Sequence, residues 1–290
     1  MPRDPYILEP LESREMLSAT LVIPPRHAPV AVVRPPLKDD CLGILPIPPL
    51  GTVLTIDGIL NVWPGNPTDF GTTWTVDTSN PTLALYGSDG IPNLDSIQQG
   101  PTPDCYFLAG IGAVAFSHPD LIQKRIAWDG NGFAVTFGTG ASTLVVHTSP
   151  EFSKSLQVQS GEVWWEVLEK AFATFRNWNW GRVNTMTSIG WGYAYEPLQA
   201  MGITTTDQNW YNLPDAEVIT LIASDLAAHQ PILFTTSNLA ANLPTLHALT
   251  IIAVSDDTVT LYNPWGFIET RKTIADLRLD STIALTVGVL

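Results

Sequence analysis

Apolar residues recur every three or four positions over residues 161–176, and this is the clearest helical pattern in the chain. The apolar stripe consists of Val163, Trp164, Val167, Leu168, Ala171, Phe172 and Phe175. On the opposite side, Glu166 and Lys170 stand four residues apart, the spacing of an ion pair on a solvated helix face. The pattern therefore predicts an amphipathic helix with a polar outer side.

Two other segments predict helices for different reasons. Residues 106–116 are apolar all round and contain Gly110 and Gly112, as is typical of a helix buried in a core. Residues 214–229 begin with Pro214 and carry Glu217 in the first turn, which are signals of a helix start.

Short β-rich runs occupy most of the remaining sequence. Residues 133–137 and 143–147, joined across Gly138 and Gly140, predict a hairpin, and further strands are expected at 232–236, 246–254, 258–263 and 282–287. Helices that precede strands indicate the α+β class, with a helical N-terminal half and a β-rich C-terminal half.

Proline use divides the chain into three parts. Residues 1–50 hold 11 of the 24 prolines and no tryptophan, which predicts a proline-rich tail or targeting segment without a packed core. Residues 51–85 form a β-rich lead-in, and residues 86–290 form the main domain.

Composition and charge exclude several classes of protein. Hydrophobic residues make up 45% and charged residues 14% of the chain, as in a globular protein. The net charge of −14 repels phosphate backbones, so nucleic acid is not an expected partner. No apolar run approaches the roughly 18 residues that a membrane span requires.

Cys105 is the first candidate for chemistry, because it stands where the apolar helix begins. Asp104 before it is a candidate helix cap, and the helix dipole and amides at that position favour a thiolate. Gln99 supplies a side-chain amide donor that would help to bind an oxyanion. Cys41, the other cysteine, lies in the proline-rich tail and is expected to be an unpaired thiol.

A histidine and an asparagine follow at long range. His247 opens one predicted strand and Asn263 closes the next, and papain-like peptidases place these residue types roughly 130–150 residues after their cysteine. A tight turn at residues 256–257 would pair Thr250 with Asn263, three residues from the register that His247 needs. A bulge or a longer turn would close that offset.

Four segments, QGPTPDCYFLAGI, WWEVLEKAF, HALTIIAV and NPWG, resemble in this order the best-known blocks of the calpain-like cysteine peptidase core. The resemblance runs from about residue 86 to residue 290. It implies a papain-like fold and an endopeptidase that cleaves proteins or peptides through an acyl-enzyme. By that resemblance Gln99 belongs to the oxyanion hole, Cys105 is the nucleophile, His247 is the base, Asn263 orients the base, and Trp265 shields the His–Asn hydrogen bond.

The sequence departs from this family at two positions and leaves two other functions open. Pro103 stands where the family usually has glycine, and Tyr106 where it has tryptophan. A transglutaminase-like acyl transferase, or a calpain-like domain that has lost activity and acts as a surface binding module, would use the same fold. The chemistry needs no cofactor, but calcium is a candidate activator by family resemblance, with no ligands that the sequence locates.

The segment LEPLESREMLSAT at residues 8–20 resembles the N-terminal motif of exported planctomycete proteins. It implies a planctomycete source and an exported or cell-surface protein, whereas a short amphipathic helix at the same place would leave the protein cytoplasmic. Cys105 and His247 are further expected to form a thiolate–imidazolium pair, which iodoacetamide would alkylate well below pH 8.

Overall fold

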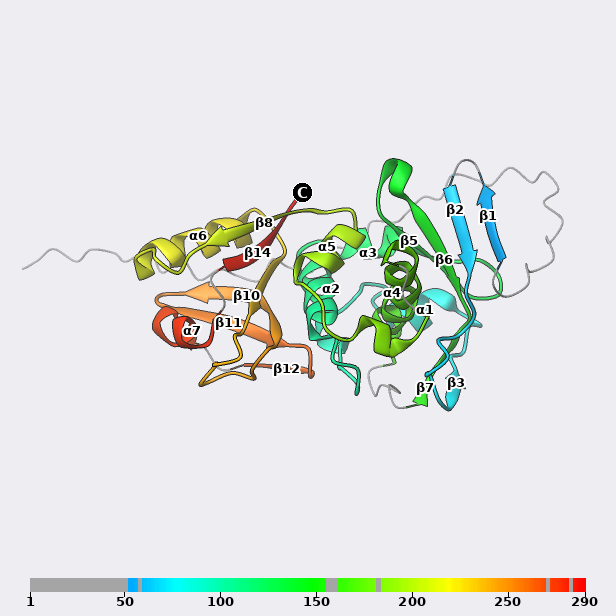
Figure 1. Cartoon of the computed structure of the whole chain (residues 1–290), viewed down its shortest axis with the longest axis horizontal. Helices are drawn as coiled ribbons and strands as arrows, with labels where there is room; N and C mark the ends of the chain where they lie inside the picture. The colour runs from blue at the N-terminus through cyan, green and yellow to red at the C-terminus, as the bar shows by residue number, and fades with distance from the viewer. Residues whose placement is uncertain (1–51, 57–58, 155–160, 181–183, 270–271, 282–283) are drawn as a thin grey trace, which may run out of the picture.

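The computed structural model describes residues 52–56, 59–154, 161–180, 184–269, 272–281 and 284–290 (Figure 1). It mixes helices and sheets, which confirms the α+β class. The tail at residues 1–50, the motif at 8–20 and Cys41 lie outside the described residues.

One half of the molecule is built around a five-stranded sheet with the order β1-β2-β6-β5-β4. Its strands are β1 (Thr52–Ile56), β2 (Ile59–Trp63), β4 (Ile126–Trp128), β5 (Phe133–Phe137) and β6 (Leu144–Thr148). β2 lies parallel to β6, and the other neighbours are antiparallel. A separate pair is formed by β3 (Thr73–Thr75) and β7 (Glu151–Ser153).

Helices lie on the side of this sheet that faces the middle of the molecule (Figure 1). They are α1 (Pro81–Tyr86), α2 (Cys105–Ser117), α3 (Pro119–Arg125), α4 (Trp164–Trp180) and α5 (Tyr195–Ala200), with short 3-10 turns at Leu94–Ser96, Gly140–Ser142 and Met186–Ile189. A purely helical N-terminal half, as the sequence pattern predicts, is not seen, because this half also contains the five-stranded sheet. The hairpin of β5 and β6 takes up the lead-in strands β1 and β2, so this half is a sheet covered by helices.

The other half contains a seven-stranded sheet with the order β12-β11-β10-β9-β14-β8, and β13 pairs with β11. The strands are β8 (Thr204–Asn209), β9 (Ile232–Thr235), β10 (Ala248–Ser255), β11 (Thr258–Asn263), β12 (Phe267–Ile268), β13 (Lys272–Thr273) and β14 (Ala284–Val289). Two helices, α6 (Asp215–Ala227) and α7 (Ile274–Asp280), accompany it (Figure 1). This β-rich C-terminal half agrees with the sequence pattern.

Helix α4 forms where the apolar stripe predicts it, but its polar side is not solvated. Glu166 and Lys170 are both buried, and the Lys170 ammonium donates to the carbonyl groups of Ser149 and Glu151. No hydrogen bond reaches either carboxylate oxygen of Glu166 from the described residues. The predicted Glu166–Lys170 pair is wrong because α4 lies between α2 and strands β5 and β6, which cover both of its sides.

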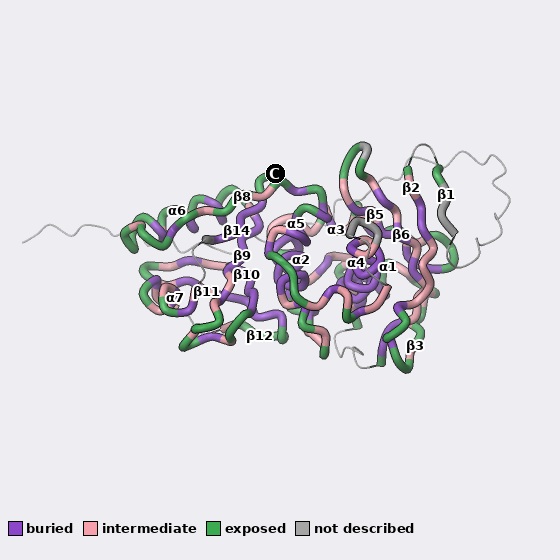
Figure 2. The backbone as a smooth tube through the Cα atoms, viewed as in Figure 1, coloured by how far each residue is buried: buried purple, intermediate pink, exposed green. Residues whose placement is uncertain are grey.

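Each half has its own hydrophobic core, and helix α2 joins them. Ten consecutive residues of α2, from Tyr106 to Ala115, are buried, as Figure 2 shows for the centre of the molecule. The Thr250 hydroxyl on β10 donates to the Ala109 carbonyl on α2 at 2.7 Å. This contact between α2 and β10 is called the seam below.

Gly112 makes the close approach at the seam possible. A Cβ atom at this position would lie 2.8 Å from the Leu94 side chain and 3.3 Å from the Thr250 hydroxyl.

In the described part of the chain no single helix has both the length and the apolar character of a membrane span.

Candidate active site

Cys105 is the first residue of α2, and its thiol faces the beginning of β10 across the seam. The Sγ atom lies 4.0 Å from the Leu246 carbonyl oxygen. The backbone amides of Ala248, Tyr106 and Cys105 itself also direct hydrogen-bond donors at the thiol. The residues on both sides of His247 therefore contact Cys105.

His247 binds Asn263 through one ring nitrogen. His247 Nε2 and Asn263 Oδ1 are 2.9 Å apart, and both residues are buried. Asn263 Oδ1 also accepts from the Trp265 amide at 3.0 Å, while Asn263 Nδ2 donates to the Glu269 carboxylate at 2.8 Å. These two contacts fix which end of the amide faces the ring. His247 Nε2 must therefore carry the hydrogen, which leaves the lone pair on Nδ1.

The pairing of β10 with β11 explains how the two side chains meet. From Ser255 to Ala253 the ladder follows the tight turn, but the register shifts between Ile251 and Ala253, so that Thr250 lies opposite Tyr262 instead of Asn263. The bulge brings Asn263 one residue closer to His247 and moves it to the same face of the sheet. Diagonal neighbours on one face are within reach of a side-chain hydrogen bond.

Trp265 packs on this pair from the turn that follows β11. Its ring centroid lies 4.6 Å from that of His247, and its side chain remains 46% exposed. The indole thus packs on the histidine while remaining partly exposed, and its role in shielding the His–Asn hydrogen bond stays a prediction.

Burial sets the charge state of the candidate pair. It raises the pKa of Cys105 to about 11, with a further contribution from the charge of Asp104, and outweighs the three amide donors. Burial also lowers the pKa of His247, although Asn263 and Glu269 oppose this shift. Both shifts oppose the expected thiolate–imidazolium pair, which stays a prediction.

Gln99 lies on the loop before α2, with its side chain turned into that loop. Its Nε2 atom donates to the Thr102 carbonyl at 2.8 Å and to Asp104 Oδ1 at 3.3 Å. Its backbone amide donates to the Pro264 carbonyl at 2.7 Å, which ties the loop to the turn that carries Trp265. The Gln99 side chain thus lies on the loop that leads to Cys105, but its Nε2 atom donates to other residues of the same loop.

Asp104 does not cap α2 with its side chain, contrary to the sequence expectation. It is fully buried beside Glu169 of α4, and the two carboxyl groups interact. Burial raises the pKa of Asp104 to about 6 and, together with the charges of Asp104 and Glu166, holds the pKa of Glu169 well above its ordinary value. The hydrogen bond between the two side chains lowers the pKa of Asp104 and raises that of Glu169, which is the direction expected when Glu169 is the donor.

Sequence reasoning missed two residues of this site. Glu169 belongs to the segment WWEVLEKAF, but a carboxylate on a helical pattern gives no sign of burial. Glu269 accepts a hydrogen bond from the Asn263 side chain, but it lies just after a strand, in a segment without a recognisable motif. Neither position has a signal in the sequence that could have identified it.

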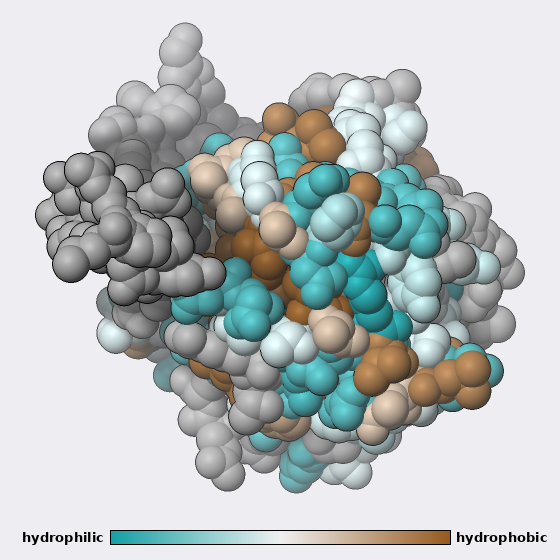
Figure 3. All heavy atoms as spheres, turned by 90° about the vertical axis from the view of Figure 1, so that its left-hand side faces the viewer, coloured by the Kyte–Doolittle hydropathy of each residue, from teal (hydrophilic) through white to brown (hydrophobic). Residues whose placement is uncertain are grey.

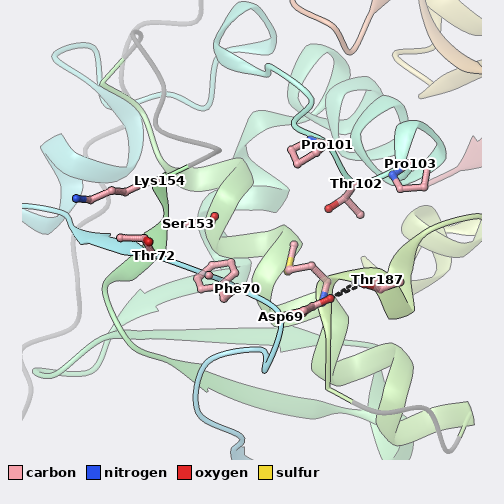
Figure 4. A pocket seen from close by; sticks show the side chains of 11 residues that line it. Asp69, Phe70, Thr72, Pro101, Thr102, Pro103, Ser153, Lys154 and Thr187 are labelled. Carbon is pink, nitrogen blue, oxygen red and sulfur yellow. Dashed lines mark hydrogen bonds between the residues drawn. The ribbon is translucent and has the colours of Figure 1, made fainter.

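A cavity of about 610 Å³ adjoins the thiol loop but does not contain the thiol. The loop residues Pro101, Thr102 and Pro103 form one wall, and Phe70, Met186 and Lys154 are among the residues that line the rest (Figure 4). Asp69, also in the lining, accepts hydrogen bonds from Thr187 and from the Met186 amide, so its charge is already satisfied.

Within the described ranges, no group of three or more histidine, cysteine, aspartate or glutamate side chains is arranged to hold a metal ion. The structure therefore indicates no position for the calcium that the family resemblance suggests, and calcium activation stays a prediction.

Comparison with known proteins adds one relative. No family model matches the chain. A thiol protease of Porphyromonas gingivalis is 28% identical over 135 residues, which are 39% of this chain and 28% of that protein. The chain thus matches little more than a quarter of the relative's length. The calpain family and the planctomycete source remain predictions. The similarity supports a cysteine peptidase in the broad sense.

Proposed function

We propose that the chain is a calpain-like cysteine endopeptidase with a papain-like fold, in which Cys105, His247 and Asn263 act as nucleophile, base and orienting amide. One observation supports this most strongly. The thiol contacts the backbone on both sides of His247, while the far nitrogen of the same ring is held by Asn263.

Because burial raises the pKa of the Cys105 thiol to about 11, His247 acts as a general base. Its Nδ1 atom takes the proton as the Cys105 sulfur attacks the peptide carbonyl carbon. The sulfur–carbon bond forms and the carbonyl becomes an oxyanion, which receives hydrogen bonds from the Cys105 amide and the Gln99 side chain. The Gln99 amide leaves the Thr102 carbonyl for this purpose.

The tetrahedral intermediate then collapses. The carbon–nitrogen bond breaks as His247 gives its proton to the leaving amine, and an acyl-enzyme remains on Cys105. Water attacks that thioester, His247 removes its proton, and the carboxylic acid product leaves with the thiol restored. Throughout the cycle Asn263 Oδ1 keeps the Nε2 hydrogen in place, so the base remains Nδ1.

Glu269 favours the peptidase over a transglutaminase-like Cys-His-Asp enzyme. Its carboxylate accepts the hydrogen of Asn263 Nδ2. An aspartate at position 263 would offer no hydrogen there and would face a second carboxylate.

Hydrolysis of fluorogenic casein tests the proposal. Cys105→Ala should abolish hydrolysis, because it removes the proposed nucleophile, whereas Cys41→Ala in the proline-rich tail should retain it. Equal losses in the two variants, or an inactive wild-type protein, would refute the assignment and favour a surface binding module.

Calcium activation is proposed from the family resemblance together with the net charge of −14. The same casein assay, run with calcium and with excess chelator, tests it. Full activity in chelator would remove calcium from the mechanism while leaving the peptidase assignment intact.

A further inference from the structure

The backbone singles out two bulky residues beside the thiol. Among the described residues, the non-glycine residues with positive φ are Trp191 (65°), His229 (55°), Leu246 (50°) and Asp256 (53°). Large side chains rarely adopt this region of φ. Two of the four have ordinary local causes: Asp256 lies in the tight turn between β10 and β11, and His229 follows the end of α6 with its amide bound to the Leu226 carbonyl.

Trp191 lies beside the loop that carries Cys105. Its amide donates to the Pro103 carbonyl at 3.0 Å, and its own carbonyl accepts from Arg176 at 2.8 Å. The next residue, Gly192, lies so close to the Tyr106 ring that a Cβ atom would be 2.3 Å from it. The backbone is therefore held in place, while the Trp191 side chain is 64% exposed.

Leu246 has the same character on the other side of the thiol. Its carbonyl oxygen lies 4.0 Å from Cys105 Sγ, and its amide donates to the Ser237 carbonyl at 3.1 Å. Its side chain is 53% exposed, although it directly precedes the buried His247. Here too, strained backbone holds a large apolar side chain at the surface.

Both side chains are more than half exposed, and both belong to segments that contact the loop or the thiol of the candidate nucleophile. Strained backbone of this kind persists only where surrounding contacts impose it, and it gathers at functional sites. An extended peptide whose carbonyl carbon reaches Cys105 would pass between the half that carries Trp191 and the half that carries Leu246. Apolar substrate side chains would cover these two surfaces and remove them from water.

We propose that Trp191 and Leu246 are specificity-determining residues, which form two walls beside the Cys105 thiol and bind bulky apolar substrate side chains on the acyl side of the bond that Cys105 attacks. This inference rests on the proposed peptidase function. Neither residue has a role in the proton transfers, so both act on substrate selection.

Stoichiometric labelling of Cys105 tests the inference separately from turnover. In a Cys41→Ala background, the rate of labelling by tosyl-phenylalanine chloromethyl ketone is divided by the rate with iodoacetamide, and mass spectrometry locates the label. The first reagent carries a benzyl group that needs an apolar wall, whereas the second is too small to need one. Trp191→Gly and Leu246→Gly should each lower this ratio by about tenfold.

Glycine is the appropriate replacement because it adopts positive φ without strain, so neither variant should be less stable. His229→Gly and Asp256→Gly are matched controls, since they relieve the same kind of backbone strain away from the thiol, and their ratio should not change. A ratio that stays constant in both Trp191→Gly and Leu246→Gly would overturn the inference. Casein hydrolysis by the same preparations reports on the peptidase function itself, so the two failures are distinguishable.

Discussion

At the scale of single residues, the hydrogen bonds around Asn263 determine which nitrogen of His247 is free to act as a base. Asn263 receives hydrogens through its oxygen and gives one to Glu269 through its nitrogen. A side-chain amide can do both at once, whereas a carboxylate can only accept. The asparagine is therefore matched to the glutamate six residues later.

This match predicts a reciprocal rescue. Asn263→Asp should lower kcat for casein by about tenfold or more, because two carboxylates would face each other and disturb the ring. The N263D/E269Q double variant should regain most of the lost activity, since a glutamine at 269 can donate to the new carboxylate. Glu269→Gln alone serves as the control and should remain active, because its amide oxygen can still accept from Asn263. If the double variant stays as inactive as N263D, Glu269 has no such positioning role.

The raised pKa of Cys105 leads to a second prediction. The pKa of the thiol is raised to about 11, so iodoacetamide labelling of Cys105 should remain slow at pH 7 and increase steeply above pH 8. Asp104→Asn should accelerate labelling at pH 8, because the negative charge that opposes the thiolate is removed while the shape is kept. Labelling rates by mass spectrometry across pH 6–11 provide the measurement. A plateau already reached below pH 8 would restore the thiolate–imidazolium pair.

At the scale of secondary-structure elements, helix α4 carries a carboxyl group that the fold does not solvate. Burial raises the pKa of Glu166 to about 9, from an ordinary value of 4.5. Between those values the folded protein binds more protons than the unfolded chain, so the free energy of unfolding falls as pH rises. Below about pH 4.5 this penalty is absent, since the group is neutral in both states.

Glu166→Gln should therefore stabilise the protein at pH 8, by about 2–4 kcal/mol, and change it little at pH 5. Urea unfolding followed by tryptophan fluorescence at the two pH values measures this difference. Glu217→Gln on the exposed start of α6 changes the net charge equally and should have little effect at either pH. A stabilisation of the same size in both variants would indicate a general charge effect instead of the burial of Glu166.

The elements also show what the sequence could and could not predict. An apolar stripe located α4, an all-apolar run located α2, start signals located α6, and β-rich runs located the strands that carry His247 and Asn263. The sequence pattern did not reveal that the polar side of α4 is covered, because the covering strands β5 and β6 lie in a separate segment of the chain. It also left the register of β10 and β11 open, because the extra residue at Ile252 has no signature among the apolar residues around it.

For the site residues, too, the sequence identified the residues but not all of their partners. Spacing and segment resemblance selected Cys105, His247, Asn263 and Trp265. The fold places His247 against Asn263 and Trp265, and the Cys105 thiol against the backbone of the residues that flank His247. Gln99 and Asp104 lie nearby, but with partners that only three-dimensional packing supplies. Their catalytic roles, like those of the other four, stay predictions.

At the scale of the whole molecule, the candidate site is divided between two cores that meet at the seam. Cys105 belongs to α2 and the sheet of five strands, whereas His247 and Asn263 belong to the sheet of seven. The end of the molecule over α6 and α7 presents mainly hydrophilic residues with scattered hydrophobic groups (Figure 3), in keeping with the net charge of −14.

The hydrogen bond across the seam should contribute measurably to stability. Thr250→Val keeps the shape of the fully buried side chain but removes its bond to the Ala109 carbonyl. The free energy of unfolding should fall by about 1 kcal/mol. Thr220→Val removes an equivalent hydroxyl bond on the exposed surface of α6 and should cost less. Equal urea midpoints for the two variants would show that the seam is held by packing alone.

The bulge in β10 has a consequence for reading other sequences of this kind. In a regular hairpin closed by a two-residue turn, two residues on opposite strands share a face only when their separation along the chain is an odd number. His247 and Asn263 are 16 residues apart, an even number, so the ladder must contain one additional residue between them. The parity of the His–Asn separation can therefore be counted in any related sequence. A relative with an odd separation and the same tight turn is expected to have no bulge, and one with an even separation is expected to keep the bulge or to lengthen the turn by one residue.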